Sequence, residues 1–168
     1  MLRNVLSLFF ENDHFRPAWE DRLPDFSSES TLGNVGLVAD GVAVGVQRVR
    51  HRDDAKDQFS HYRQDNVGLS VVSITAAGRI HSVTRAMGGA AAESTVIAAS
   101  GLYSSLKPGE VLMYDKGADN YMSTAIAKEG AALLTPSVVV NKILTLSELE
   151  HSASIDRARI VVEHHIEK

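Results

Sequence analysis

The stretch that decides the fold is VGLVADGVAVGV, residues 35–46. It is rich in valine, a β-branched residue that favours extended backbone, and it therefore predicts a β-strand. One residue does not fit this pattern, because Asp40 stands in the middle of the apolar run. Aspartate is depleted in strands and costly to bury without a partner, so its presence there requires an explanation.

Two further apolar runs follow this strand and predict a hairpin. The segment VGLSVVSITAAGRIHSVTRAMGG, residues 67–89, divides at Ala77–Gly78 into two strands joined by a tight turn. The charged segment between the first strand and this hairpin, residues 48–66, is predicted to be a loop.

The second half of the chain alternates predicted helices and strands. They are a helix at 91–106, a strand at 111–114, a helix stopped at Gly130, a strand at 131–140 and a long helix at 146–168. Pro136 places its strand at an edge or makes it end there, and Ser147 is the predicted N-cap of the long helix. Antiparallel strands followed by strands joined through helices predict an α/β fold, with a mixed central sheet flanked by helices.

Composition divides the chain into two parts. Residues 1–34 are polar and rich in turn formers, with a short helix predicted at 2–10, and we interpret them as an N-terminal lead-in arm. Residues 35–168 carry the predicted sheet and form one domain of ordinary size. The last helix ends soon after Glu163, which we interpret as truncation of this domain at its C-terminus.

Composition also argues against several function classes. The chain has 168 residues, no cysteine and a net charge of −4. It can form neither disulfides nor thiolate zinc sites, and it has no broad basic surface for nucleic acid. No apolar run approaches the roughly 20 residues of a membrane span, and no phosphate-binding glycine loop supports a small-molecule α/β enzyme. The lack of cysteine suits an intracellular protein, in the nucleus of a eukaryote or the cytoplasm of a bacterium.

Three acidic residues lie where acids are uncommon. Asp40 interrupts an apolar strand, Asp115 ends the strand at 111–114, and Glu163 lies on the apolar-leaning side of the last helix. Clustered carboxylates repel one another, and Mg²⁺ or Mn²⁺, which prefer oxygen ligands, relieve that repulsion. Taken singly, the same acids are ordinary turn formers, helix caps or surface residues, so the spacing leaves both interpretations open.

Several ordered motifs, between about residue 17 and the end, resemble the DDE-superfamily endonuclease domain of Harbinger-type and insertion-sequence transposases. LVADG (37–41) resembles the first strand of that family, with its Asp-Gly pair. FSHYRQDNVGLSVVSITAAGRIHSVTRAMGG (59–89) is similar to its Tyr-Lys/Arg segment, hairpin and Gly-Gly pair. SGLYSSLKPGEVLMYDKGAD (100–119) resembles the helix, turn and strand that end in Asp-x-Gly, and IDRARIVVEHHIEK (155–168) resembles the last helix, Arg-Ile-x-Val-Glu.

The resemblance implies a ribonuclease H-like DDE catalytic domain over residues 35–168. It implies that Asp40, Asp115 and Glu163 are the catalytic acids and hold one or two Mg²⁺ or Mn²⁺ ions. The implied reaction is metal-dependent hydrolysis of a DNA phosphodiester, followed by attack of the exposed 3′ hydroxyl on target DNA. The implied partners are transposon ends, target DNA, a separate DNA-recognition module or protein, and a second copy of the chain in a homodimer.

Five residues are expected to contact DNA: His61, Tyr62, Arg63, Lys116 and Arg159. The first three lie in the charged segment, where backbone contact and simple solvation are the alternatives. Lys116 adjoins Asp115 and Arg159 precedes Glu163 by one turn. Each would contact a phosphate or steady a carboxylate, and an ordinary salt bridge is the alternative.

Departures from the family pattern leave a second function open. After Asp40–Gly41 the run VAVGV stands where the family has a polar threonine or an acid. Ala118 replaces an aromatic residue, and AAAES (90–94) replaces a Ser-Asp pair. The alternative is a catalytically decayed or domesticated transposase-derived module that acts through protein or DNA binding.

Overall fold

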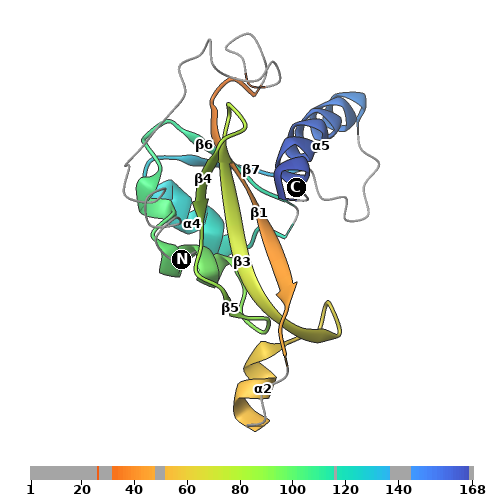
Figure 1. The fold of residues 1–168 in the computed structure, drawn as a ribbon. Coiled ribbons are helices and arrows are strands. Elements are labelled where there is room, and N and C mark those ends of the chain that lie inside the picture. Colours follow the sequence, from red (N-terminus) through yellow and green to blue (C-terminus); the bar gives the residue numbers. More distant parts are fainter. Residues whose placement is uncertain (1–25, 27–31, 48–51, 116, 137–144, 167–168) are drawn as a thin grey trace.

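The structure is a computed structural model that describes residues 26, 32–47, 52–115, 117–136 and 145–166. Within these ranges the chain forms a mixed α/β sheet flanked by helices (Figure 1). The elements in chain order are β1 (Val35–Gly45), α2 (Arg52–Gln58), β2 (Phe59–Ser60), β3 (Asp65–Thr75), β4 (Ile80–Val83), β5 (Met87–Gly88), α3 (Glu93–Ser100), the 3-10 helix η3 (Tyr103–Ser105), β6 (Val111–Met113), α4 (Asn120–Lys128), β7 (Ala132–Leu134) and α5 (Leu146–Ile166). The predicted short helix at residues 2–10 lies outside these ranges.

The sheet has the strand order β2-β3-β1-β6-β7, and β4 and β5 also pair with β3. The pairs of β3 with β1, β2, β4 and β5 are antiparallel, whereas β1 with β6 and β6 with β7 are parallel. The predicted order, antiparallel strands first and helix-joined strands after, is therefore confirmed. Strand β7 ends the path two residues before Pro136, so the predicted edge or strand end is also confirmed.

Strand β1 is buried at its start and exposed at its end. Its first five residues, Val35–Ala39, are buried, and its last two are exposed. The parallel pairing with β6 reaches the pair Val38 and Met113, whereas the antiparallel pairing with β3 continues to Gly45. Asp40 therefore lies where β1 leaves the buried part of the sheet, and its side chain is 23% exposed. This position explains how an apolar strand accommodates an aspartate without burying it fully.

Two hydrophobic cores form on the two faces of the sheet. One joins Leu37 and Leu112 of the sheet to residues of α3 and α4, such as Ile97 and Ile126. The other joins the sheet to the buried residues Ile155 and Ala158 of α5. Phe26 and Leu32, which belong to the predicted N-terminal arm, also pack into the second core. The boundary of that arm at residue 34 stays a prediction.

The predicted loop at 48–66 is wrong within its described part. It contains α2, β2 and the first residues of β3. Helix α2, RDDAKDQ, is almost entirely charged or polar, so it shows none of the apolar periodicity by which a helix is recognised in a sequence.

The helix predicted at 91–106 is shorter than expected. Helix α3 ends at Ser100 because Gly101 adopts a left-handed conformation, with φ of 76°, which terminates helices.

The prediction of Ser147 as the N-cap of the last helix is also wrong. The Thr145 hydroxyl accepts a hydrogen bond from the Glu148 N–H at 3.3 Å, and the Glu148 carboxylate accepts one from the Thr145 N–H at 2.9 Å. This reciprocal pair is a capping box, and it makes Thr145 the N-cap.

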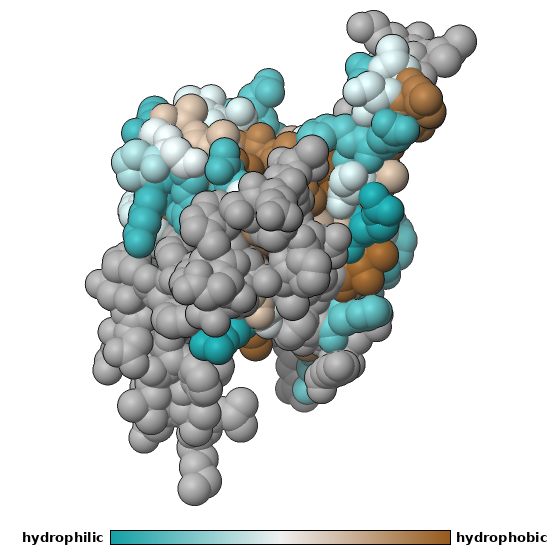
Figure 2. Space-filling model, turned by 90° about the horizontal axis from the view of Figure 1, so that it is seen from above, coloured by the Kyte–Doolittle hydropathy of each residue, from teal (hydrophilic) through white to brown (hydrophobic). Residues whose placement is uncertain are grey.

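The surface of the described residues mixes polar and apolar side chains. Figure 2 shows hydrophobic residues reaching the surface in small patches among hydrophilic ones. None of the described helices is long and apolar enough to cross a membrane.

Candidate active site

Strand register brings two of the predicted acids to one level of the sheet. Val38 of β1 pairs with Met113 of the parallel strand β6. Asp40 lies two residues after Val38, and Asp115 lies two residues after Met113. Because side chains alternate between the faces of a strand with a period of two, this spacing brings both acids to the same level of the sheet. Both line a cavity of about 560 Å³, hereafter the acidic cavity.

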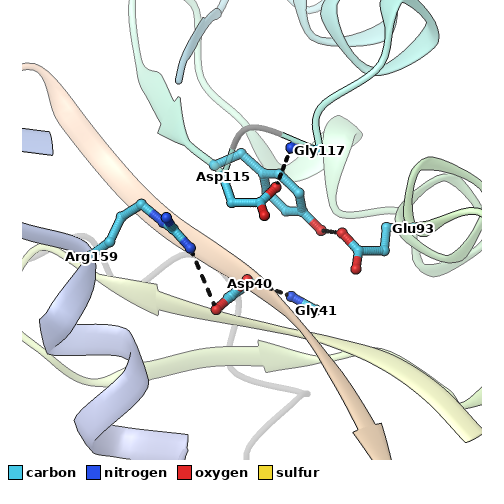
Figure 3. Close-up of polar contacts among 7 residues, drawn as sticks. Asp40, Gly41, Glu93, Asp115, Gly117 and Arg159 are labelled. Carbon is cyan, nitrogen blue, oxygen red and sulfur yellow. Dashed lines mark hydrogen bonds and ion pairs between the residues drawn. The ribbon is translucent and has the colours of Figure 1, made fainter. Parts of the chain in front are cut away.

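Asp40 is held by its own strand and by α5. One carboxylate oxygen, Oδ1, accepts a hydrogen bond from the Gly41 N–H at 2.9 Å. The other, Oδ2, lies 3.8 Å from Nη2 of Arg159, and both side chains are largely shielded, at 23% and 16% exposed. Burial of Ile155 and Ala158 docks α5 against the sheet and so brings Arg159 to this carboxylate (Figure 3). The sequence suggested that Arg159 contacts a phosphate, steadies the Glu163 carboxylate or forms an ordinary salt bridge. The partner found is Asp40, and the expected contact of Arg159 with DNA stays a prediction.

Asp115 is positioned by a tight turn at the end of β6. Its Oδ1 accepts a hydrogen bond from the Gly117 N–H at 2.6 Å, which closes an aspartate turn. Lys116, the intervening residue, lies outside the described residues, so its expected contact with DNA stays a prediction. The turn aims the Asp115 carboxylate at the acidic cavity, whose lining includes both Asp115 and Gly117.

A third acid in the cavity, Glu93, was missed by the sequence analysis. It begins α3, and its Oε2 accepts a hydrogen bond at 2.5 Å from the hydroxyl of the fully buried Tyr114. Burial raises the pKa of Glu93, and the negative charges of Asp115 and Asp40 raise it further. The Tyr114 hydrogen bond and, more weakly, Arg63 lower it. Burial, followed by the neighbouring Glu93 carboxylate, also raises the pKa of Tyr114.

Sequence alone offered only a weak signal for Glu93. An acid in the first turn of a helix is common, because the helix dipole favours negative charge there. Figure 3 shows Glu93 and Arg159 on opposite sides of Asp40, although the three residues come from α3, α5 and β1.

The glycine after Asp40 leaves room for the Glu93 carboxylate. A Cβ atom at Gly41 would lie 2.1 Å from Oε1 of Glu93, closer than real carbon atoms approach an oxygen. The Asp-Gly pair therefore serves two purposes. The Gly41 N–H orients Asp40, and its missing side chain leaves room for Glu93.

Asp119, a fourth acid on the cavity wall, uses both carboxylate oxygens in hydrogen bonds within the protein. Its two carboxylate oxygens accept hydrogen bonds from the Ser94 hydroxyl at 2.5 Å and the Met122 N–H at 2.8 Å. These bonds, that of Ser94 first, lower the pKa of Asp119, and the bond from the Met122 N–H caps α4. Asp119 thus ties α3 to α4 beneath the cavity.

The predicted DNA-contacting segment lies partly on the cavity wall. Tyr62 and Arg63 line the acidic cavity, and Tyr62 is 90% exposed. The Arg63 guanidinium carbon lies 5.7 Å from the centre of the Tyr62 ring, a cation–π distance. His61 is exposed, is not part of the cavity lining, and packs its ring edge-on against Phe59 at 5.3 Å.

The third predicted acid, Glu163, belongs to α5, four residues or about one turn beyond Arg159. Its side chain is not among those that the structure describes. Among the side chains that are described, no three of the His, Asp and Glu residues are grouped closely enough to hold a metal ion. The assignment of Asp40, Asp115 and Glu163 as a metal-binding triad therefore stays a prediction.

Together, the fold and the cavity define an α/β protein with a carboxylate-lined site at the end of neighbouring parallel strands. A family model described as DDE superfamily endonuclease matches residues 39–168, and the chain belongs to this family. A search of curated proteins gave no match. Membership in the family indicates a transposase-type nuclease, for which the substrate is DNA.

Proposed function

We propose that this chain is a metal-dependent DNA endonuclease and strand transferase with a ribonuclease H-like fold over residues 35–168. One observation carries the proposal. Asp40 of β1 and Asp115, two residues after the end of the neighbouring parallel strand β6, lie at the same level of the sheet and line one cavity. The antiparallel strands β1, β3 and β4, followed by the parallel strands β6 and β7, support the ribonuclease H-like topology.

The chemistry of the cavity suits Mg²⁺ or Mn²⁺. Its described lining offers carboxylate oxygens from Asp40, Glu93 and Asp115 and includes no histidine. Oxygen donors of this kind are the ligands that these hard cations prefer. Asp40, Asp115 and Glu163 would hold one or two such ions. When bound, these ions would activate the attacking water or 3′ hydroxyl and stabilise the leaving oxygen.

The remaining residues of the site would bind and orient the DNA. Arg159 lies against Asp40, where it offsets the negative charge of the carboxylate and can reach a phosphate oxygen of a bound strand. Arg63 and Tyr62 line the same cavity and would hold the strand next to the reacting phosphate. Lys116, beside Asp115 in sequence, would add a further phosphate contact.

Metal binding tests the proposal directly. A ligand that binds only the folded state stabilises it. At Mg²⁺ or Mn²⁺ concentrations about tenfold above the dissociation constant, the melting temperature should rise by roughly 3–6 °C. Asp115→Asn should abolish this rise, whereas Asp156→Asn, which changes an exposed aspartate on α5, should leave it intact. Nicking of plasmid DNA by the wild type and its loss in Asp115→Asn would complete the test.

The Arg159–Asp40 ion pair favours a second candidate function, a transposase-derived module that binds DNA without cutting it. The arginine offsets the negative charge of Asp40 and so competes with a metal ion for this carboxylate. This function predicts an unchanged melting temperature at millimolar Mg²⁺ and Mn²⁺ together with retained binding of DNA. That combination of results would overturn the endonuclease proposal.

A further inference from the structure

A second, smaller hollow of about 220 Å³ adjoins the acidic cavity. The two share four lining residues, Gly41, Tyr62, Arg63 and Glu93. Whatever enters the acidic cavity can therefore place an adjacent group in this second space, hereafter the apolar hollow. It lies over the part of β1 and β3 that extends beyond the pairing with β6, since Ala43 and Leu69 pair with each other there.

The two spaces differ in chemistry. The acidic cavity has four charged residues that the hollow lacks: Asp40, Asp115, Asp119 and Arg159. The residues lining the hollow alone are neutral and mostly apolar: Ala43, Ser60, Val67, Leu69, Gly89 and Ala91. With the cations of the proposed function held among the carboxylates of the acidic cavity, the two spaces together would suit a ligand that carries an anionic group directly beside an uncharged, largely apolar one. A nucleotide unit has this character, with an anionic phosphate on one side of the sugar and a base on the other.

The shared wall supplies the groups that hold unpaired bases. Tyr62 presents a ring that is 90% exposed, and the Arg63 guanidinium lies 5.7 Å from its centre. Aromatic rings and guanidinium planes are the side chains on which single-stranded bases stack. Glu93 stands at the boundary of the two spaces and offers a carboxyl group to the polar edge of a base.

The size of the hollow limits its occupant. Its volume of about 220 Å³ is below the roughly 300–1,000 Å³ of sites for drug-sized ligands. One small planar group therefore fits better than a whole nucleotide. Because a base must leave the stack to enter, single-stranded DNA should occupy the hollow more readily than an intact duplex.

We propose that the apolar hollow binds one unstacked nucleobase of the DNA strand whose phosphate occupies the acidic cavity, with Tyr62 as its stacking platform. This inference rests on the proposed function, since it requires that DNA reach the acidic cavity. It assigns Tyr62 to a base, whereas the sequence predicted contact with the DNA backbone. Tyr62 is then a binding residue for the substrate, and Ala43 is part of the wall of the hollow.

Binding of two short oligonucleotides tests the proposal. The probes are fluorescently labelled octathymidylate and the same strand with abasic sugars in place of its nucleotides. Fluorescence anisotropy would be measured with and without Mg²⁺. Wild type should bind the base-carrying strand about tenfold more tightly than the abasic strand. Tyr62→Ala, and Ala43→Leu, which fills the hollow, should each remove that difference by weakening binding of the base-carrying strand far more than binding of the abasic strand.

Two matched variants serve as controls. Tyr121→Ala removes another exposed tyrosine that lines neither space, and Val44→Leu enlarges the exposed neighbour of Ala43. Neither should alter the preference for bases. Tyr62 is exposed, so its alanine variant keeps the test valid if Ala43→Leu fails to fold.

The outcomes separate the two proposals. Equal binding of both strands by wild type, or equal losses for both strands in Tyr62→Ala, would overturn the nucleobase site and leave the endonuclease proposal standing. Failure of wild type to bind either strand, with or without Mg²⁺, would also overturn the nucleobase site, whereas the endonuclease proposal is decided by the metal titration and the nicking of plasmid DNA.

Discussion

Glu93 and Tyr114 form a hydrogen-bonded pair at the wall of the acidic cavity. The pKa of Glu93 is raised above its ordinary value of 4.5, chiefly by burial. The folded protein therefore holds this proton more tightly than the unfolded chain does. The stability that this proton contributes is fully present below pH 4.5 and is lost as the pH rises through the folded pKa.

We accordingly expect Glu93→Gln to melt at a higher temperature than wild type at pH 7, since glutamine avoids burying a charge and still accepts the Tyr114 hydrogen bond. The advantage should shrink towards pH 4. Thermal melts between pH 4 and 8 measure it, with Glu150→Gln on the exposed side of α5 as the control. If the wild-type and Glu93→Gln melting curves shift in parallel with pH, the buried titration is refuted.

A side chain at Gly41 is expected to displace the Glu93 carboxylate. Gly41→Ala places a methyl group 2.1 Å from the Glu93 carboxylate and should destabilise the fold by about 1–3 kcal/mol. Gly45→Ala, in the same strand with nothing within 4 Å of the added carbon, should cost little. Urea unfolding measures both. In a double-mutant cycle, Glu93→Ala should relieve most of the cost of Gly41→Ala. Additive effects would show that Glu93 is not the obstacle.

Among the elements, α5 has the largest influence on the site, because it carries Arg159 to Asp40. Its docking depends on Ile155, which is fully buried, rather than on strong amphipathicity. Ile155→Ala should destabilise the protein by about 2–5 kcal/mol through loss of burial and formation of a cavity. Ile160→Ala removes a side chain that is 44% exposed on the same helix and should cost far less. Urea unfolding measures both losses of stability. If the two variants lower the free energy of unfolding by similar amounts, α5 does not dock through Ile155.

At the scale of the whole molecule, the net charge of −4 limits how DNA can be held. Without a broad basic surface, binding should depend on a few local cations, and its salt dependence should be shallow. About three phosphate contacts give a slope of roughly −2 to −3 in a log–log plot of affinity against salt. Arg63→Ala should reduce the magnitude of that slope by about 1, whereas Arg85→Ala, at an exposed residue outside the cavity lining, should not. A steep slope that neither variant changes would show that DNA binds outside the acidic cavity.

Local patterns predicted the elements that have apolar periodicity or turn chemistry. The valine-rich strand, the hairpin at Ala77–Gly78 and the helix stopped before Gly130 are all present. The polar helix α2 could not be predicted in this way, because no apolar stripe marks it. The N-cap was placed at Ser147 instead of Thr145 because both residue types cap helices, and only the hydrogen bonds distinguish them.

The sequence by itself determined the mixed α/β class, the succession of antiparallel strands and then helix-joined strands, and Asp40 and Asp115 as acids in unusual places. It did so because burial periodicity and turn preferences act over a few residues. Only the tertiary structure decided that Glu93 and Arg159 stand beside Asp40, and that an apolar hollow adjoins them. Strand register and helix docking bury surfaces from segments remote in the chain, and no local pattern encodes which of those surfaces will meet.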